Sequence, residues 1–174
     1  DQLVHDGTMQ NLHMIIAVDR AGFVGEDGIS HQGILDASLL NSVPNITVFS
    51  PSNYDELKSS FINAIYHTEG VVVIRYPRGR GSNIEWQCPF EEVPIGKGRK
   101  LRDGNSVAIL SIGTTGVDVE KAIDSLSEER PDISPAHYDM RFVKPIDEDI
   151  LSEVAQSFKH IVTVEDGVRT GGFG

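Results

Sequence analysis

Short apolar segments alternate along the chain with stretches in which apolar residues recur at helical spacing. The short segments are rich in apolar and β-branched residues, which is typical of buried strands in a parallel sheet covered on both faces. The predicted strands are residues 14–18, 46–49, 71–75, 107–112, 136–140 and 160–165. The predicted helices are the tail of one over residues 1–10, then 34–40, from 52 to about 67, 116–127 and 147–158.

Capping signals support two of these helices. Ser52 stands where an N-cap is expected, with Asp55 three residues later, in a pattern related to the capping box. Asp147 is expected to cap the helix that reaches Phe158. The alternation of strand, helix and strand predicts an α/β fold with a doubly wound parallel sheet.

The stretch from Tyr76 to about residue 102 breaks this alternation, because it contains Pro77, Pro89 and Pro94, many glycines and few apolar runs. The predicted division is a first domain over residues 1–80, a linker over 81–103 and a second domain over 104–174. The chain begins without a helix cap and ends on the loop GGFG, so we expect it to be cut from a longer protein at both ends.

Composition narrows the classes of function. The 174 residues carry a net charge of −11, which argues against general nucleic-acid binding, since phosphate backbones need a basic surface. One cysteine, Cys88, rules out a disulfide framework within the chain. No apolar run approaches the roughly 20 residues of a membrane-spanning helix. A cytoplasmic location is the default expectation, and a cleaved targeting segment remains open.

The chemistry concentrates in the stretch DRAGFVGEDGISHQG, residues 19–33, which follows the first strand. Arg20 comes just after that strand, and Arg78 comes shortly after the strand over 71–75. The carboxyl ends of parallel strands share one edge, where ligands bind. Two guanidinium groups at this edge would form a multidentate phosphate clamp. The alternative is a surface ion pair with a carboxylate such as Asp19.

Asp27 and His31 form a second pair in the same stretch. An Asp four residues before a His within a glycine-containing loop can meet the imidazole and set its tautomer. Such a His is a suitable proton shuttle at neutral pH. The alternative is that His31 only satisfies a backbone carbonyl. Cys88 has no basic neighbour and is expected to be a bystander, and the other histidines have no metal-ligand spacing.

Six motifs together resemble one enzyme family. The first motif, DRAGFVGEDGISHQG, is followed in order by PNITVFSPSNYDEL, VVVIRYPRG, PIGKG, MRFVKPID and VTVEDGVRTGGFG. Their order and spacing resemble the 1-deoxy-D-xylulose-5-phosphate synthases, which are thiamine-diphosphate-dependent, transketolase-like enzymes. The resemblance implies the end of a pyrimidine-binding domain followed by most of a transketolase C-terminal domain.

The resemblance also implies substrates and site residues. The substrates would be pyruvate and D-glyceraldehyde 3-phosphate, and the product a precursor of isoprenoids, thiamine and pyridoxal. Arg20 and Arg78 match the arginines that hold the acceptor phosphate. His31 matches the histidine that handles protons, and Asp27 matches the residue that binds acceptor hydroxyls.

Thiamine diphosphate and Mg²⁺ would be bound mainly by segments absent from this chain, because the GDG…N metal motif and the activating Glu are missing. The chain alone is therefore expected to be inactive, and the parent enzyme to be a homodimer. Two alternatives stay open. One is a transketolase or a 2-oxo-acid dehydrogenase β-subunit, and the other is a non-catalytic module that only makes dimer or partner contacts.

Overall fold

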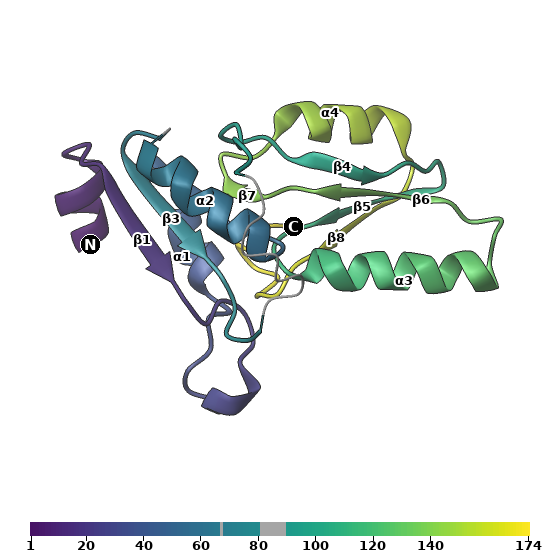
Figure 1. The fold of residues 1–174 in the computed structure, drawn as a ribbon, viewed down its shortest axis with the longest axis horizontal. Coiled ribbons are helices and arrows are strands. Elements are labelled where there is room, and N and C mark those ends of the chain that lie inside the picture. Colours follow the sequence, from purple (N-terminus) through teal and green to yellow (C-terminus); the bar gives the residue numbers. More distant parts are fainter. Residues whose placement is uncertain (67, 81–89) are drawn as a thin grey trace.

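The computed structural model describes residues 1–66, 68–80 and 90–174. Its strands form two four-stranded sheets, which lie side by side in Figure 1. The first sheet has the order β1-β3-β2-β7, and the second has the order β4-β6-β5-β8. The strands are β1 (Met14–Val18), β2 (Ile46–Phe49), β3 (Val71–Arg75), β4 (Arg99–Arg102), β5 (Val107–Ser111), β6 (Pro135–Asp139), β7 (Phe142–Lys144) and β8 (Ile161–Val164).

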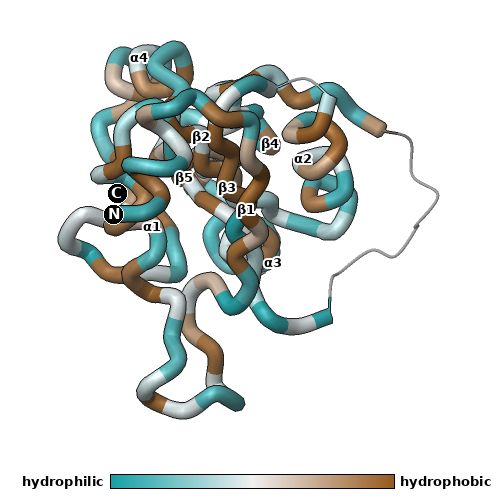
Figure 2. The backbone as a smooth tube through the Cα atoms, turned by 90° about the vertical axis from the view of Figure 1, so that its left-hand side faces the viewer, coloured by the Kyte–Doolittle hydropathy of each residue, from teal (hydrophilic) through white to brown (hydrophobic). Residues whose placement is uncertain are grey.

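The helices lie between and beside these strands. They are the wide helical turn η1 (Leu3–Thr8), the 3₁₀ turn η2 (Gly25–Asp27), α1 (Asp36–Asn41), α2 (Tyr54–Tyr66), α3 (Thr115–Glu129) and α4 (Glu148–Ser157). In Figure 2 the apolar strands β1, β3 and β2 run between α1 on one side and α2 on the other. None of the helices in the described part of the chain has the length and apolar character needed to cross a bilayer.

Alternate side chains of β3 show how the first sheet is buried on both faces. Val71 and Val73 join a large apolar cluster that also contains α1 and much of the second sheet. Val72 and Ile74 join a second cluster under α2. Every residue of β3 is buried, as expected for a central parallel strand covered on both sides. The α/β fold class predicted from the sequence is thus confirmed.

Two features differ from a purely parallel, doubly wound arrangement. Strand β7 pairs antiparallel with β2 at the edge of the first sheet, and β4 pairs antiparallel with β6 at the edge of the second. Both strands are short or strongly charged, so their sequences carry no apolar run. Strand β4 also lies within the predicted linker over residues 81–103. The predicted domain division itself stays a prediction.

The start of α2 is another correction. The cap is Asn53 and not Ser52, because Asn53 Oδ1 accepts the N–H of Glu56 at 2.9 Å. Glu56 in turn accepts the N–H of Ser52, the residue before the cap, at 2.9 Å, so the two side chains satisfy backbone groups here without the reciprocal exchange of a capping box. The prediction for Asp147 is confirmed: its carboxylate accepts the N–H groups of Asp149 and Ile150 at the start of α4.

Candidate functional site

Two loops leave the first sheet at the same edge, and they carry the predicted arginines. Strands β1 and β3 are parallel neighbours, with Val18 paired to Arg75 at their ends. The pairing continues beyond the strands, because Tyr76 N donates to Val18 O at 2.9 Å and Ala21 N donates to Tyr76 O at 3.0 Å. The loop after β1 and the loop after β3 therefore begin side by side.

Residues 19–33, the site loop, project from the body of the molecule in Figure 1. The two ends of the loop are joined by Gly22 and Gly33, which exchange backbone hydrogen bonds of 3.1 and 2.9 Å. A Cβ on Gly33 would overlap the carbonyl oxygen of Arg20, so only glycine allows this close approach. Arg20 itself has a left-handed backbone, with φ of 60°. This neck, formed by the pairing of Gly22 with Gly33, thus fixes the direction in which the Arg20 side chain leaves the sheet.

Arg20 and Arg78 meet on the carboxylate of Asp27. Arg20 Nε donates to Asp27 Oδ2 at 2.7 Å, and Arg78 Nη1 donates to Asp27 Oδ1. The Asp27 side chain is only 16% exposed, whereas both arginines remain accessible to solvent. Arg20 also pairs with Asp19, and Arg78 pairs with Glu26 at 2.7 Å. Two guanidinium groups from different loops therefore bind the same carboxylate, one at each oxygen.

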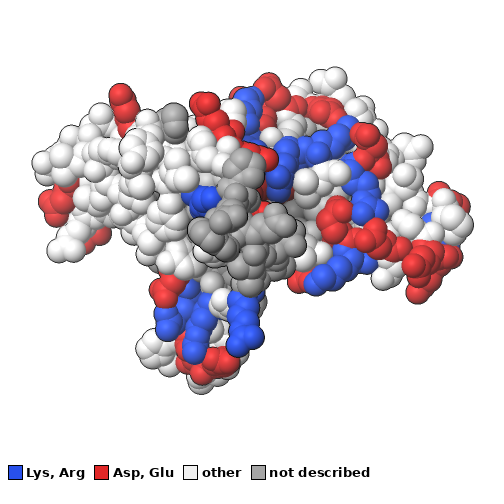
Figure 3. Space-filling model, in the orientation of Figure 1, with Lys and Arg blue, Asp and Glu red and all other residues white. Residues whose placement is uncertain are grey.

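Charged side chains of both signs gather at the site loop. Figure 3 shows basic side chains side by side on the projecting loop, with acidic side chains at its base and towards its end. The hydrogen bond that Arg20 donates to Asp27 and the charge of Asp19 raise the pKa of Arg20. The Asp27 carboxylate, bound by a guanidinium group at each oxygen, holds Arg20 and Arg78 together.

His31 lies on the same loop without contacting Asp27. Both oxygens of Asp27 bond to arginines, and His31 Nδ1 lies 2.9 Å from Ser30 Oγ. Spacing of four residues does not bring the pair together here, because residues 28–31 are an irregular exposed turn and not a helix. The predicted contact between Asp27 and His31 is therefore wrong in this structure, while the exposed imidazole remains available to a ligand.

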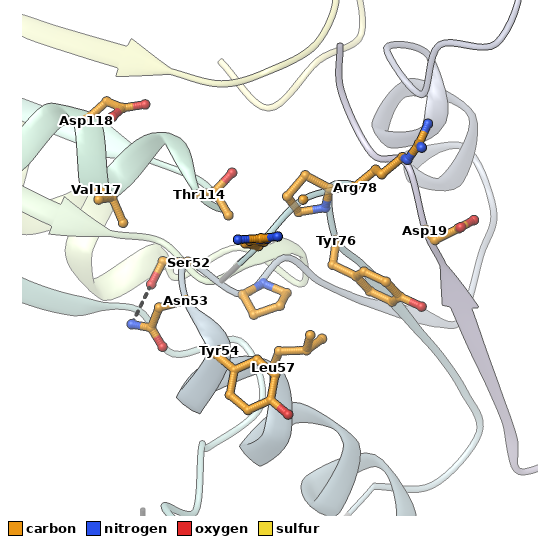
Figure 4. A pocket seen from close by; sticks show the side chains of 14 residues that line it. Asp19, Ser52, Asn53, Tyr54, Leu57, Tyr76, Arg78, Thr114, Val117 and Asp118 are labelled. Carbon is orange, nitrogen blue, oxygen red and sulfur yellow. Dashed lines mark hydrogen bonds between the residues drawn. The ribbon is translucent and has the colours of Figure 1, made fainter. Parts of the chain in front are cut away.

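A cavity of about 600 Å³ lies beside these loops. Of the four predicted site residues, Arg78 lines it, with Asp19, Tyr76 and the residues at the start of α2 and α3. In Figure 4 Arg78 and Asp19 lie at one end, and Thr114, Val117 and Asp118 lie at the other. The cavity therefore extends from the site loop to the junction of the two sheets.

Sequence reasoning missed several residues that hold the site. Arg75 is buried at the end of β3 and forms a two-pronged pair with Asp36 at 2.9 and 3.1 Å, and it donates to Ser50 at 3.1 Å. Gln32 bridges the loop to both backbone groups of Val24, at 2.6 and 2.8 Å. A buried strand that ends in Arg signals that a carboxylate partner is needed, although it does not say which one.

Several other polar side chains make structural contacts. His137 is fully buried, with Nε2 2.7 Å from Ser111 Oγ and Nδ1 2.5 Å from Glu120 Oε1. Ser111 is also fully buried, and the group joins β5, β6 and α3. Lys144 donates to the carbonyls of Asn41 and Val43 at the end of α1. Cys88 and His67 lie outside the described residues.

The comparisons with family models and with known proteins agree on one family. Residues 1–82 match the transketolase pyrimidine binding domain, and residues 96–174 match the transketolase C-terminal domain. The chain is 48% identical over 174 residues to the 1-deoxy-D-xylulose-5-phosphate synthase of Bacteroides fragilis. It is 51% identical over 175 residues to that of Cytophaga hutchinsonii. All of this chain is aligned in each case, but it spans only 27% of each relative's length.

A solved structure supports the same relationship. The split-gene transketolase in its inactive β4 tetramer superposes with a TM-score of 0.84 at 30% sequence identity. The alignment covers 99% of this chain and 54% of that chain. The likeness therefore includes both sheets and the way in which they are joined.

Proposed function

Because the chain belongs to the transketolase family, we propose that the enzyme that carries it is a 1-deoxy-D-xylulose-5-phosphate synthase. In the proposed reaction pyruvate loses carbon dioxide, and its remaining two-carbon unit is joined to the aldehyde carbon of D-glyceraldehyde 3-phosphate. The product, 1-deoxy-D-xylulose 5-phosphate, would supply isoprenoid, thiamine and pyridoxal synthesis. The chain covers only part of the relatives' length, so the whole activity is a proposal for the longer protein.

The convergence of Arg20 and Arg78 on one carboxylate supports this function more than any other observation. Asp27 presents two oxygens to the two guanidinium groups, and a phosphate monoester presents three oxygens of the same kind. Both arginines are supplied by loops at the carboxyl edge of a parallel sheet, where α/β proteins bind their ligands. The acceptor phosphate would take the place of the Asp27 carboxylate between them.

The residues of this chain would mainly bind and orient the acceptor. Arg20 and Arg78 fix its phosphate, which lowers the entropic part of the barrier by holding the aldehyde in one position. Asp27, released from the arginines, would accept hydrogen bonds from the acceptor hydroxyls. His31, which is exposed on the same loop, would move a proton at the new carbinol oxygen.

The cofactors are assigned to other parts of the enzyme. Among residues 1–66, 68–80 and 90–174, no group of three or more His, Cys, Asp and Glu side chains is arranged to hold a metal ion. Because the sequence also lacks the GDG…N motif and the activating Glu, we propose that Mg²⁺ and thiamine diphosphate are bound mainly outside this chain. Thiamine diphosphate acts as an electron sink in enzymes that use it.

We also propose that the parent enzyme is a cytoplasmic homodimer and that the 174-residue chain is inactive alone. The split-gene transketolase tetramer that resembles this chain was determined in an inactive state, which supports the second point. Light scattering of the active full-length enzyme tests the first, and a monomer mass would reject it. Formation of deoxyxylulose phosphate by the pure 174-residue chain would reject the second.

The function is tested with the full-length enzyme and three substrate sets. Pyruvate with D-glyceraldehyde 3-phosphate should give carbon dioxide and 1-deoxy-D-xylulose 5-phosphate in equal amounts. Turnover of ketose phosphates instead would identify a transketolase, and acyl transfer to a lipoyl carrier would identify a 2-oxo-acid dehydrogenase component. No turnover with any of the three would favour a module that makes only partner contacts.

A further inference from the structure

The residues after β8 pack against the base of the site loop, although they are more than 130 positions away along the chain. Asp166 accepts the N–H of Phe23, with its two carboxylate oxygens at 3.1 and 3.2 Å from the nitrogen. On the other side of the neck, Val168 N donates to Ile34 O at 3.2 Å, and Ser38 Oγ donates to Thr170 O at 3.2 Å. Residues 166–170, the brace, thus hold both ends of the site loop.

Asp166 is the one residue of the brace whose side chain makes the contact. Its carboxylate lies so close to Gly22 that a Cβ there would overlap it. Gly22 also has a positive φ of 77°, which glycine adopts without strain. The absence of a side chain at position 22 is therefore what lets the carboxylate reach the Phe23 amide.

The Phe23 amide lies close in sequence to the residues of the proposed phosphate clamp. Phe23 follows Arg20 by three residues and precedes Asp27 by four. Arg20 depends on a left-handed backbone, and its carbonyl is in close contact with Gly33. A shift of the Phe23 amide therefore changes the direction of the chain between Arg20 and Asp27, which bind each other at the clamp.

We propose that Asp166 is a positioning residue for the acceptor site, through which the second sheet holds the loop that carries Arg20 and Asp27. The inference rests on the proposed function and adds a residue to it from the far end of the chain. Asp166 touches the loop backbone and no reacting group, so its effect should fall on the acceptor and not on pyruvate.

The chain offers a matched control in Glu165. Glu165 lies in the same turn after β8, and its carboxylate also accepts backbone N–H groups. Its partners are Phe173 and Gly174 in its own segment, and not the site loop. Loss of Glu165 therefore disturbs the turn without removing the hydrogen bond to Phe23.

The test compares Asp166→Ala, Asp166→Asn and Glu165→Ala in the full-length enzyme. Asp166→Ala should raise KM for D-glyceraldehyde 3-phosphate by roughly tenfold, the value of one charge-assisted hydrogen bond. KM for pyruvate should change less than about twofold. Asp166→Asn keeps an oxygen acceptor and should recover most of the loss, and Glu165→Ala should leave both constants near wild type.

Amide hydrogen exchange gives a second measurement that does not depend on activity. Exchange at Phe23 should become faster in Asp166→Ala and should stay unchanged in Glu165→Ala. Unchanged Phe23 exchange, or an equal rise in KM for both substrates, would overturn the positioning role. A wild-type enzyme that does not use the aldehyde phosphate would reject the proposed function instead, so the two failures are distinguishable.

Discussion

At the scale of single residues, Arg20 and Arg78 decide how the proposed enzyme recognises its acceptor. Replacing either by Ala in the full-length enzyme should weaken use of D-glyceraldehyde 3-phosphate by roughly ten- to a hundredfold, since a hydrogen bond to an anion contributes about 1.5–3 kcal/mol. Lys should restore only part of this, because it keeps the charge and loses the fork of donors. The measurement is kcat/KM with each substrate.

Unphosphorylated D-glyceraldehyde is the control for this prediction. It lacks the group that the arginines bind, so Arg20→Ala and Arg78→Ala should cost it little. The affinity for pyruvate should also hardly change. Equal losses for both aldehydes would mean that the two arginines support the structure of the loops and do not bind phosphate.

A second group of charged residues contains the buried Glu56, Asp139 and Arg141 together with the partly exposed Arg99. Glu56 accepts from Arg99 at 2.8 Å, from Arg141 at 2.9 Å and from both the N–H and the hydroxyl of Ser52. Asp139 is fully buried and has only the longer contact to Arg99, at 3.3 Å, and the backbone N–H of Arg141. Burial and the nearby charge of Glu56 raise the pKa of Asp139 to about 7.

This raised pKa predicts a dependence of stability on pH. Above the ordinary pKa of 3.8 the unfolded chain loses the Asp139 proton, whereas the folded chain keeps it up to about pH 7. The contribution of Asp139 to stability therefore falls as the pH rises through this window. Asp139→Asn is always neutral, so urea unfolding should show that it gains stability relative to wild type as the pH rises from 5 to about 7, with no further gain above that.

The exposed Asp132 provides the control, since its ion pair with Arg130 lowers its pKa and leaves it charged throughout that range. Asp132→Asn should follow the wild-type pH dependence. If Asp139→Asn also follows it, then Asp139 is ionised in the folded chain at pH 5 and the arginines outweigh its burial.

At the scale of elements, the sequence predicts the strands and helices that have a periodic apolar pattern. Strand β3 has four β-branched residues followed by Arg75, and all five residues are buried. Strand β4 reads Arg-Lys-Leu-Arg and β7 has three residues, so neither has a pattern that a sequence can reveal. Both exist because they pair with a strand that is already placed, which is a tertiary effect.

The candidate site was predictable to a similar degree. The positions of Arg20 and Arg78 after parallel strands predict that they lie at one edge, and the structure brings them together on Asp27. The contact of Asp166 with Phe23 could not be read from the sequence, because it depends on how the second sheet is placed against the first. The local sequence indicates which side chains follow a strand, but it does not indicate which distant segment packs against them.

The N-cap of α4 gives a prediction at this scale. Asp147 is buried and accepts the N–H groups of Asp149, Ile150 and Gly98 at 2.9 to 3.2 Å. Asp147→Ala should lower the free energy of unfolding by about 2 to 3 kcal/mol, because a cap is lost and the N–H of Gly98 is left without a partner. Asp147→Asn, which keeps one acceptor, should lose less.

Thermal unfolding measures this effect, and the neighbouring Glu148 is the control. Glu148 is exposed in the first turn of α4, so Glu148→Ala should cost only a few tenths of a kcal/mol, as is usual for a favourable charge near a helix N-terminus. Similar losses for Asp147→Ala and Glu148→Ala would show that general helix propensity, and not the cap, sets the stability of this end.

At the scale of the whole molecule, the two sheets form one body. Strand β7 comes after β6 of the second sheet and then pairs with β2 of the first. The largest apolar cluster contains Val48 and Val73 of the first sheet together with Leu110 and Tyr138 of the second. The pair of Glu56 and Arg141 also joins α2 to the turn between β6 and β7. This shared core is what allows the brace to hold the site loop.

The shared core predicts that the two sheets unfold together, and Phe142 of β7, which packs in the separate apolar cluster under α2 in the first sheet, tests this. Its ring packs against Phe49 with centroids 4.6 Å apart, and it is almost fully buried. Phe142→Leu should cost about 1 to 2 kcal/mol, which is usual for a core substitution, and should leave a single urea transition.

Amide exchange of Val73 in β3 and of Tyr138 in β6 should then accelerate by the same factor. Leu101→Ala, on the exposed edge strand β4, should change neither. Faster exchange in one sheet alone would show that the sheets are separate cooperative units, and the brace could then loosen without unfolding the sheet that carries Arg20 and Arg78.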